Sequence, residues 1–381
     1  MANHNQQLTN PVGRLGIIGM RGCEAITDKI DSFLVEWKRD YFPEDDEQPT
    51  FKIDAVCPRF GTGEGKGMIR QSIRGYDLYI IADMFNYGVT YEMYGKTVPM
   101  SPDDHYQDLK RIISATCGKA RRINVIMPML YEGRQHRRSG RESLDCSLAL
   151  QELVAMGVDN IITFDAHDAR VHNAIPLTGF ENFQPVYQMI KALVNGHYTK
   201  HLDAEHTMII SPDEGGLSRG IYYSSVLGID LGMFYKRRDY TVIVKGRNPI
   251  VSHEFLGANV EGKDVIVVDD MISSGDSVLD VCKQLKKLGA NKIFVFACFG
   301  LFCEGLERID KAYADGVFNK IFTTNLIYQT EELKQRKWYE SVEMSKYIAY
   351  IISTLNCDRS ISALVDPVNR IKSFLEKHGI Q

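Results

Sequence analysis

Two adjacent carboxylates followed by a run of small residues form the segment best suited to chemistry. Residues 265–277 read VIVVDDMISSGDS, so an apolar stretch leads into Asp269 and Asp270. Carboxylates at the end of a strand lie where α/β sheets bind ligands, and they can hold the hydroxyls of a sugar. A small-residue loop at a helix start favours a bound phosphate. An ordinary strand, turn and acidic helix cap is the alternative interpretation.

Other polar residues follow apolar stretches in the same way. His167 comes shortly after the apolar residues 160–164, and the nearby Asp165 favours a site role over that of a core histidine. Asp213 follows Ser-Pro and could cap a turn, although the Gly-Gly pair after Glu214 favours close approach of a ligand to the backbone. Three cations at residues 236–238 are either surface charges or partners of a phosphate chain.

The elements that position these residues alternate between short apolar runs and amphipathic segments, which is typical of α/β architecture. Strands are predicted at residues 15–19, 78–82, 124–127, 160–164, 207–211, 233–236, 264–268 and 292–297. Helices are predicted at residues 103–117, capped by Ser101 or Asp103, at 143–156, ended by Gly157, and at 277–288, ended by Gly289.

The length of 381 residues suits two domains. Two comparable α/β halves are expected to meet near residues 181–185. The predicted ranges are 12–182 for an N-terminal domain, 183–366 for a C-terminal domain and 367–381 for a helical extension.

Composition excludes several classes of function. A net charge of −4 argues against a general electrostatic interaction with nucleic acid, which needs a basic face. The sequence lacks an apolar run of membrane-spanning length, and its first residues lack the apolar centre of a signal peptide. Eight cysteines without a CxxC pair indicate reduced thiols rather than a zinc site or disulfide framework. A cytoplasmic location is therefore expected.

The 265–277 segment resembles the phosphoribosyl-pyrophosphate loop of the type I phosphoribosyltransferase fold. Further segments resemble motifs of the ribose-phosphate pyrophosphokinases, and they occur in family order between residues 15 and 366. They are FGTGE at 60–64, MPMLYEGRQHRR at 127–138, FDAHD at 164–168, SPDEGGLSR at 211–219, KRR at 236–238 and TTNLIYQ at 323–329.

This resemblance implies two tandem phosphoribosyltransferase-like domains, each with a mainly parallel sheet flanked by helices. It implies transfer of the diphosphoryl group of ATP to ribose 5-phosphate, with Mg²⁺ and a homo-oligomer built from dimers into hexamers. The implied catalytic residues are Arg134, Lys236 and Arg238, and the implied metal ligands are His167 and Asp213. The implied ATP-binding residues are Phe60, Thr62, Glu64, Arg134, Gln135 and His167. The implied ribose 5-phosphate residues are Asp269, Asp270, Ser273, Ser274, Gly275, Asp276 and Ser277.

The chain departs from the family pattern in several places. Ser273 stands where a third Asp is common, Asp276 replaces a usual Gly, and His136 replaces the acidic member of the loop triplet. Thr62 replaces an Asn, and residues 87–100 read as an insertion. The spacing between residues 240 and 263 is also longer than is typical of the family. Two alternatives therefore stay open: a catalytically weak regulatory homologue, which should lack the cationic loop and the histidine, and a phosphoribosyltransferase, which needs only one such domain.

Overall fold

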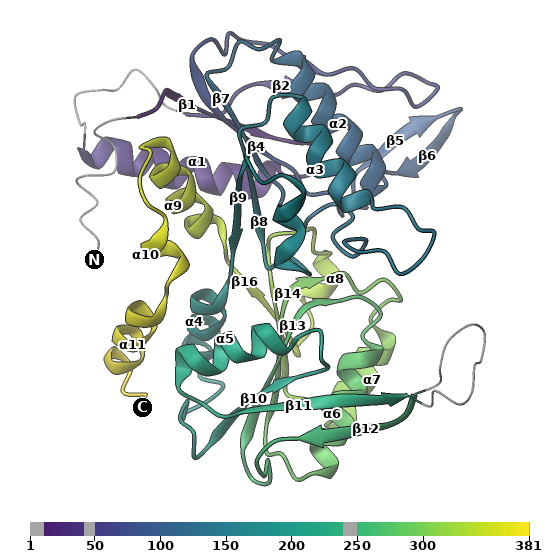
Figure 1. Cartoon of the computed structure of the whole chain (residues 1–381), viewed down its shortest axis with the longest axis vertical. Helices are drawn as coiled ribbons and strands as arrows, with labels where there is room; N and C mark the ends of the chain where they lie inside the picture. The colour runs from purple at the N-terminus through teal and green to yellow at the C-terminus, as the bar shows by residue number, and fades with distance from the viewer. Residues whose placement is uncertain (1–10, 42–49, 239–249, 381) are drawn as a thin grey trace. The chain divides into compact units, whose positions relative to one another are not determined.

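The chain folds into two units in a computed structural model that describes residues 11–41, 50–238 and 250–380. The first unit comprises Met1–Gln184, Asn325–Tyr328 and Glu343–Val365, and the second comprises Pro185–Thr324, Gln329–Val342 and Asp366–Gln381. No helix in the described part is long and apolar enough to cross a membrane. Each unit is a sheet covered by helices, as the alternating sequence pattern predicts (Figure 1).

The first unit is built on a five-stranded parallel sheet in the order β1-β4-β7-β8-β9. These strands are β1 Arg14–Gly19, β4 Tyr76–Ile81, β7 Arg122–Ile126, β8 Asn160–Phe164 and β9 Gly179–Phe183. The short strands β2 Ala55–Val56 and β3 Met68–Ile69 pair with each other, as do β5 Thr90–Met93 and β6 Lys96–Pro99. The helices are α1 Glu24–Tyr41, α2 Pro102–Ala115, α3 Asp145–Ala155, the 3₁₀ helix η2 Ala169–Ala174, α9 Ser345–Asn356 and α10 Ser362–Val365.

Both faces of this sheet are buried, which is why its strands are almost continuously apolar. Side chains of α2 and α3, including Leu109 and Leu150, pack with Leu78 and Val125 in one core cluster. On α1, the Trp37 ring stacks on Tyr350 of α9 at 4.5 Å between centroids. The helix that returns from the far end of the chain therefore completes the first unit.

A buried carboxylate, that of Asp77 in β4, ties α9 to the sheet. It accepts two hydrogen bonds from the Arg122 guanidinium, from Nε at 2.7 Å and Nη2 at 2.8 Å. It also accepts hydrogen bonds from Asn124, Asn356 and the Tyr79 hydroxyl. Arg122 in turn donates to the carbonyl of Leu355 at 2.7 Å. Because these bonds supply the partners that a buried charge needs, the network fixes β4, β7 and α9 together.

The second unit is built on a seven-stranded sheet in the order β12-β11-β10-β13-β14-β15-β16, parallel except for the β11–β12 pair. Its strands are β10 Thr207–Ser211, β11 Leu231–Arg238, β12 Ile250–Leu256, β13 Asp264–Ile272, β14 Ile293–Gly300, β15 Lys320–Thr324 and β16 Tyr339–Val342. Its helices are α4 Val186–Asn195, α5 Leu217–Leu227, α6 Asp276–Lys287, α7 Glu307–Ala314, α8 Glu331–Lys334 and α11 Val368–Lys377.

The core of the second unit follows from the apolar stripe of α6. Val278, Cys282 and Leu285 are buried in one cluster with β13 and β14 residues such as Val267 and Val295. The helix Pro367–Gln381 expected from sequence is observed as α11, where Phe374 contacts Tyr187 of α4 edge to face at 5.9 Å.

Several local expectations are confirmed. Ser101 caps α2, and its side chain and that of Asp104 form a reciprocal capping box. Gly157 and Gly289 follow their helices with φ of 90° and 86°, which is left-handed backbone that glycine adopts readily. Residues 87–100 contain the β5–β6 hairpin, and their being an insertion stays a prediction. The eight cysteines are free thiols, as expected, and Cys117 and Cys303 are exposed.

The predicted domain ranges differ from the units. A continuous C-terminal domain at 183–366 was expected, whereas Asn325–Tyr328 and Glu343–Val365 belong to the first unit and Asp366–Gln381 belongs to the second. The physical reason is that α9 packs on α1 and that Asn356 hydrogen-bonds Asp77. Apolar periodicity identifies such a helix but does not say which sheet it covers.

Asp83 makes the stability of the first unit dependent on pH. Burial raises the pKa of this carboxyl to about 6, although the N–H groups of Phe85 and Tyr328 donate to it at 2.9 and 2.7 Å. Between about pH 4 and 6 the folded state holds a proton that the unfolded state has released, so this group's contribution to stability falls as pH rises.

Asp83→Asn removes that titration. The free energy of unfolding of the wild type relative to Asp83→Asn is expected to fall by on the order of 1–3 kcal/mol between pH 4 and pH 7. Urea denaturation at several pH values measures this difference, in which titration of all other groups cancels. Parallel pH curves for the two proteins would contradict the assignment of a raised pKa to Asp83.

Candidate functional site

The carboxyl end of β8 holds the first group of candidate residues in the first unit. Asp165 is buried and has a φ of 41°, an uncommon conformation for a residue other than glycine. Its N–H donates to Phe183, and the N–H of Ala166 donates to the Asn182 side chain at 3.0 Å. These β9 contacts hold the strained turn that presents His167 as an exposed side chain.

The loop after β7 reaches the same strand end. His136 places its Nε2 3.4 Å from an Asp168 oxygen and its ring 5.3 Å from the His167 ring. The hydrogen bonds of Arg170 are the main cause that lowers the pKa of Asp168, and the charge of a protonated His136 also lowers it. The structure therefore brings His136 and His167 together. From sequence, His136 is only a departure from the family pattern, because nothing in the sequence indicates its partners.

In the loop after β7, some of the other residues pack against the fold and others are exposed to solvent. The ring of Tyr131 stacks on Tyr106 at 4.4 Å and its hydroxyl donates to Asp103 at 2.6 Å, so Tyr131 is a packing residue. Gln135 donates to the carbonyl of Ser143 at 2.9 Å. Arg134 is exposed. This cation is thus carried on a loop whose two ends are attached to the fold.

Residues 60–64 form a tight turn, in which the N–H of Phe60 donates to Glu64 and that of Gly63 donates to Phe60. Thr62 donates its hydroxyl to the Glu64 carboxylate at 2.8 Å. The turn is anchored by Arg59, which pairs with buried Asp108 at 3.0 Å. The Phe60 side chain is 56% exposed, so a fixed turn presents an aromatic ring to solvent.

In the second unit, Asp213 lies just after buried β10. One oxygen, Oδ1, accepts the N–H groups of Gly215 and Gly216 at 3.0 and 3.2 Å, and Ser211 donates to the Asp213 carbonyl at 2.7 Å. The turn-capping role considered from sequence is therefore present. These bonds also hold the carboxylate in one orientation, as a ligand would need.

Asp269 and Asp270 end the apolar part of β13, as expected. Burial raises the pKa of Asp269, and the neighbouring Asp270 raises it further, while Arg219, 3.9 Å away, lowers it. Arg219 comes from α5 and belongs to the SPDEGGLSR segment. A cation beside two adjacent carboxylates that are largely withdrawn from water reduces their mutual repulsion.

The 273–277 loop leads from β13 into α6. Gly275 has a φ of 88° and immediately precedes the first helical residue, Asp276. Asp276 exchanges hydrogen bonds with Ser274 and pairs with Arg308 of α7 at 2.5 Å. Arg308 is not predictable from sequence, because it lies far along the chain and in no motif; it also pairs with Glu304.

Lys236 and Arg238 belong to β11, where their backbones pair with β12 at His253 and Ile250. Their side chains lie outside the described residues, so their predicted roles stay predictions. His167 belongs to the first unit and Asp213 to the second, so their shared role in metal binding also stays a prediction.

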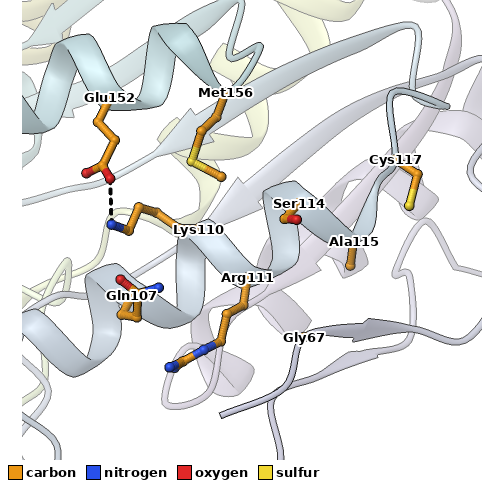
Figure 2. A pocket seen from close by; sticks show the side chains of 9 residues that line it. All are labelled: Gly67, Gln107, Lys110, Arg111, Ser114, Ala115, Cys117, Glu152 and Met156. Atoms are coloured by element: carbon orange, nitrogen blue, oxygen red, sulfur yellow. Dashed lines mark hydrogen bonds and ion pairs between the residues drawn. The ribbon is translucent and has the colours of Figure 1, made fainter. Parts of the chain in front are cut away.

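None of the predicted site residues lines a cavity of about 620 Å³ in the first unit, although its lining residue Arg111 shares Asp108 with Arg59, which anchors the 60–64 turn. Figure 2 shows α2 and α3 along it, with Lys110 hydrogen-bonded to Glu152. Arg111 also lines it and pairs with Asp108 at 2.6 Å. Because both cations have carboxylate partners, the cavity does not resemble a prepared anion site.

Comparisons with known proteins agree with this arrangement over most of the chain. Residues 17–157 match the N-terminal domain of ribose phosphate pyrophosphokinase, and residues 178–335 match the phosphoribosyl transferase domain. Ribose-phosphate pyrophosphokinase of Vibrio cholerae is 27% identical over 82% of this chain and 90% of its own length. That of Shewanella oneidensis is 28% identical with the same coverage. The crystal structure of phosphoribosylpyrophosphate synthetase from Mycobacterium smegmatis has a TM-score of 0.70 at 19% identity, covering 90% of this chain and 98% of that chain.

The fold and the β13–loop–α6 segment define a two-domain α/β protein with phosphoribosyltransferase-type domains. The N-terminal match is specific to one family within that class. The chain belongs to the ribose-phosphate pyrophosphokinase family.

Proposed function

We propose that this protein is a ribose-phosphate diphosphokinase. The C1 hydroxyl oxygen of ribose 5-phosphate attacks the β-phosphorus of ATP, and a bond forms between them. The bond from the β-phosphorus to the oxygen shared with the α-phosphate breaks and the hydroxyl proton is released to water, giving phosphoribosyl pyrophosphate and AMP. The observation that carries the proposal is the carboxylate pair of β13 leading through Gly275 into α6, in a chain that matches both family domains.

The second unit supplies the sugar-phosphate residues. The loop Ser273, Ser274, Gly275, Asp276 and Ser277 binds the 5-phosphate, because backbone N–H groups at the start of α6 favour an anion. Asp269 and Asp270 hold the ribose hydroxyls, which need hydrogen-bond acceptors. Arg219 near Asp269 supports this role, since its positive charge reduces the repulsion between the two carboxylates when no sugar is bound.

The first unit supplies the ATP residues. The exposed ring of Phe60 on its anchored turn, with Thr62 and Glu64, receives the adenine of a neighbouring subunit. His167 and Gln135 contact the phosphates, and Arg134 stabilises charge on the transferring group. Lys236 and Arg238, which belong to β11 of the second unit, also stabilise charge on the transferring group. The protein's task is mainly positioning and neutralisation of charge.

Magnesium fits part of this donor set. A carboxylate held in one orientation, as in Asp213, suits a hard ion that keeps several waters, whereas the nitrogen of His167 suits a phosphate oxygen or a metal-bound water better. When bound, Mg²⁺ would neutralise ATP oxygens. A cytoplasmic homo-oligomer of dimers built into hexamers is part of the proposal.

The direct test follows both products in one assay. Purified full-length protein is incubated with ATP, Mg²⁺ and ribose 5-phosphate, and AMP and phosphoribosyl pyrophosphate are quantified together. AMP is expected to form only when ribose 5-phosphate is present, and in an amount equal to that of phosphoribosyl pyrophosphate. Asp270→Asn, which removes a proposed sugar ligand, is a matched inactive control.

Formation of ADP would show a simple kinase instead. Diphosphate release from phosphoribosyl pyrophosphate and a nucleobase, without AMP formation, would show a phosphoribosyltransferase. If the protein binds its substrates but shows no turnover, the alternative of a catalytically weak regulatory homologue would be supported. Against that last alternative, Arg134, Gln135, His167, Lys236 and Arg238 are all retained.

Asp276→Gly tests whether the added carboxylate disturbs phosphate binding. Because Asp276 pairs with Arg308 of α7, its charge is largely compensated, and the KM for ribose 5-phosphate is expected to stay within about 2-fold. Thermal stability should fall slightly, since an acidic residue in the first turn of a helix is lost. Steady-state kinetics and thermal unfolding measure the two effects. A KM lowered 5-fold or more would mean that the carboxylate opposes the bound phosphate.

A further inference from the structure

The turn between α4 and β10 gathers two histidines and an aspartate that the proposed reaction does not use. His201, Asp203 and His206 lie within six residues of sequence, all in the second unit. Each offers one ligand atom, and these atoms lie within 4.8 Å of one another. The two imidazole rings stack at 4.4 Å between centroids with 25° between their planes.

The spacing of these atoms suits a small dication. His206 Nδ1 lies 2.8 and 3.0 Å from the two Asp203 oxygens, and His201 Nδ1 lies 3.9 Å from Oδ2. Ligands bound tetrahedrally at about 2.1 Å are separated by about 3.4 Å. The observed distances between the ligand atoms lie on either side of that value, so small rotations of the side chains would bring the three atoms to tetrahedral spacing around one ion.

The backbone that carries these ligands is already fixed. Asp203 Oδ1 accepts the N–H groups of Glu205 and His206, both at 2.9 Å, and the N–H of Thr207 donates to the Asp203 carbonyl. The carbonyl of His201 accepts the hydroxyls of Thr199 and Thr207 at 2.9 and 2.8 Å. Binding therefore requires ordering of side chains but not of this backbone, which lowers its cost in conformational entropy.

We propose that His201, Asp203 and His206 bind a transition-metal dication of the Zn²⁺ type. Two imidazole nitrogens and one carboxylate select such an ion over Mg²⁺, which prefers oxygen ligands. Water fills the remaining position, because the His201 and His206 side chains are 58% and 49% exposed.

This site is separate from the proposed magnesium site. The three ligands precede β10, whereas Asp213 follows its carboxyl end. The strand between them spans Thr207–Ser211, a length of roughly 16 Å at about 3.3 Å per residue. A metal at this turn stabilises the folded second unit and takes no part in the transfer of the diphosphoryl group.

The test titrates Zn²⁺ into metal-stripped full-length protein by calorimetry and records the absorption spectrum with Co²⁺. Wild type is expected to bind one equivalent at this site, and Zn²⁺ is expected to raise its Tm. His201→Ala and His206→Ala should each weaken binding by about 10-fold or more. His378→Ala, which changes an exposed histidine of the same unit, is the matched control and should bind like wild type.

His201→Ala is the decisive variant, because the hydrogen bonds of this turn use the His201 backbone and leave its fold intact. Unchanged Zn²⁺ affinity in His201→Ala would overturn the proposal. A sulfur-to-cobalt charge-transfer band would also overturn it, by indicating the exposed thiols of Cys117 or Cys303 instead. Both readouts are independent of turnover, so failure here and failure of the proposed activity are distinguishable.

Discussion

Arg134→Ala is expected to lower kcat by about 100-fold or more while changing the KM values modestly. In the proposed transfer, negative charge on the diphosphoryl group is redistributed as one bond breaks and another forms. A guanidinium that binds this charge mainly in the transition state contributes to kcat rather than to substrate affinity. Arg134 is exposed on its loop, so its removal should leave the fold intact.

The measurement is steady-state kinetics with both substrates, accompanied by circular dichroism. Arg141→Ala is the matched control, since Arg141 is an exposed cation of the same loop with no assigned role, and its kcat should remain near that of wild type. If Arg134→Ala keeps the wild-type kcat, Arg134 is only a solvated loop residue. An equal loss in both variants would indicate a general effect of loop charge.

Asp77→Ala is expected to lower the free energy of unfolding by about 3–5 kcal/mol. The change removes the buried acceptor of the Arg122 guanidinium, whose side chain is only 20% exposed. It also removes the acceptor for the side-chain amides of Asn124 and Asn356. The largely buried Arg122 guanidinium would then keep the Leu355 carbonyl but lose its buried carboxylate, and Asn124 and Asn356 would each lose one of their acceptors. Leaving a largely buried charge without its counter-charge costs more than the net contribution of the hydrogen bonds.

Urea denaturation measures this effect. Asp54→Ala is the matched control, because the Asp54–Arg70 pair is also aspartate with arginine in the first unit but is more than half exposed, and its loss should cost under about 1 kcal/mol. The double variant Asp77→Ala/Arg122→Met should be less destabilised than the sum of the single changes. A cost for Asp77→Ala as small as that of the control would refute the role given to the buried network.

The parts of the fold that sequence predicted are those set by local pattern. The capping box of Ser101, the apolar stripe of α6 and the left-handed Gly157 depend on residues a few positions apart. The carboxylate pair Asp269–Asp270 was likewise found from one continuous segment. The same reasoning could not assign α9 to the first unit, because that assignment depends on contacts with a helix more than 300 residues earlier.

The candidate site was predictable to the same extent. Positions that match motifs, such as His167 and Asp213, could be named, but their immediate partners could not. Arg308 beside Asp276 is an example, since it comes from a separate helix and matches no motif. The geometry of such pairs is a property of the tertiary fold and is not encoded at any fixed spacing.

The return of α9 to the first unit has a consequence for how the protein is made on the ribosome. Domains near the N-terminus generally fold first during synthesis. Here the sheet and α1 emerge early, yet the helix that contributes Tyr350 against Trp37 and Asn356 against Asp77 emerges more than 300 residues after α1. Until then the part of α1 that packs on α9 lacks its partner. The nascent first unit therefore stays incomplete until more than 300 further residues have been synthesised, and it exposes apolar surface during that time.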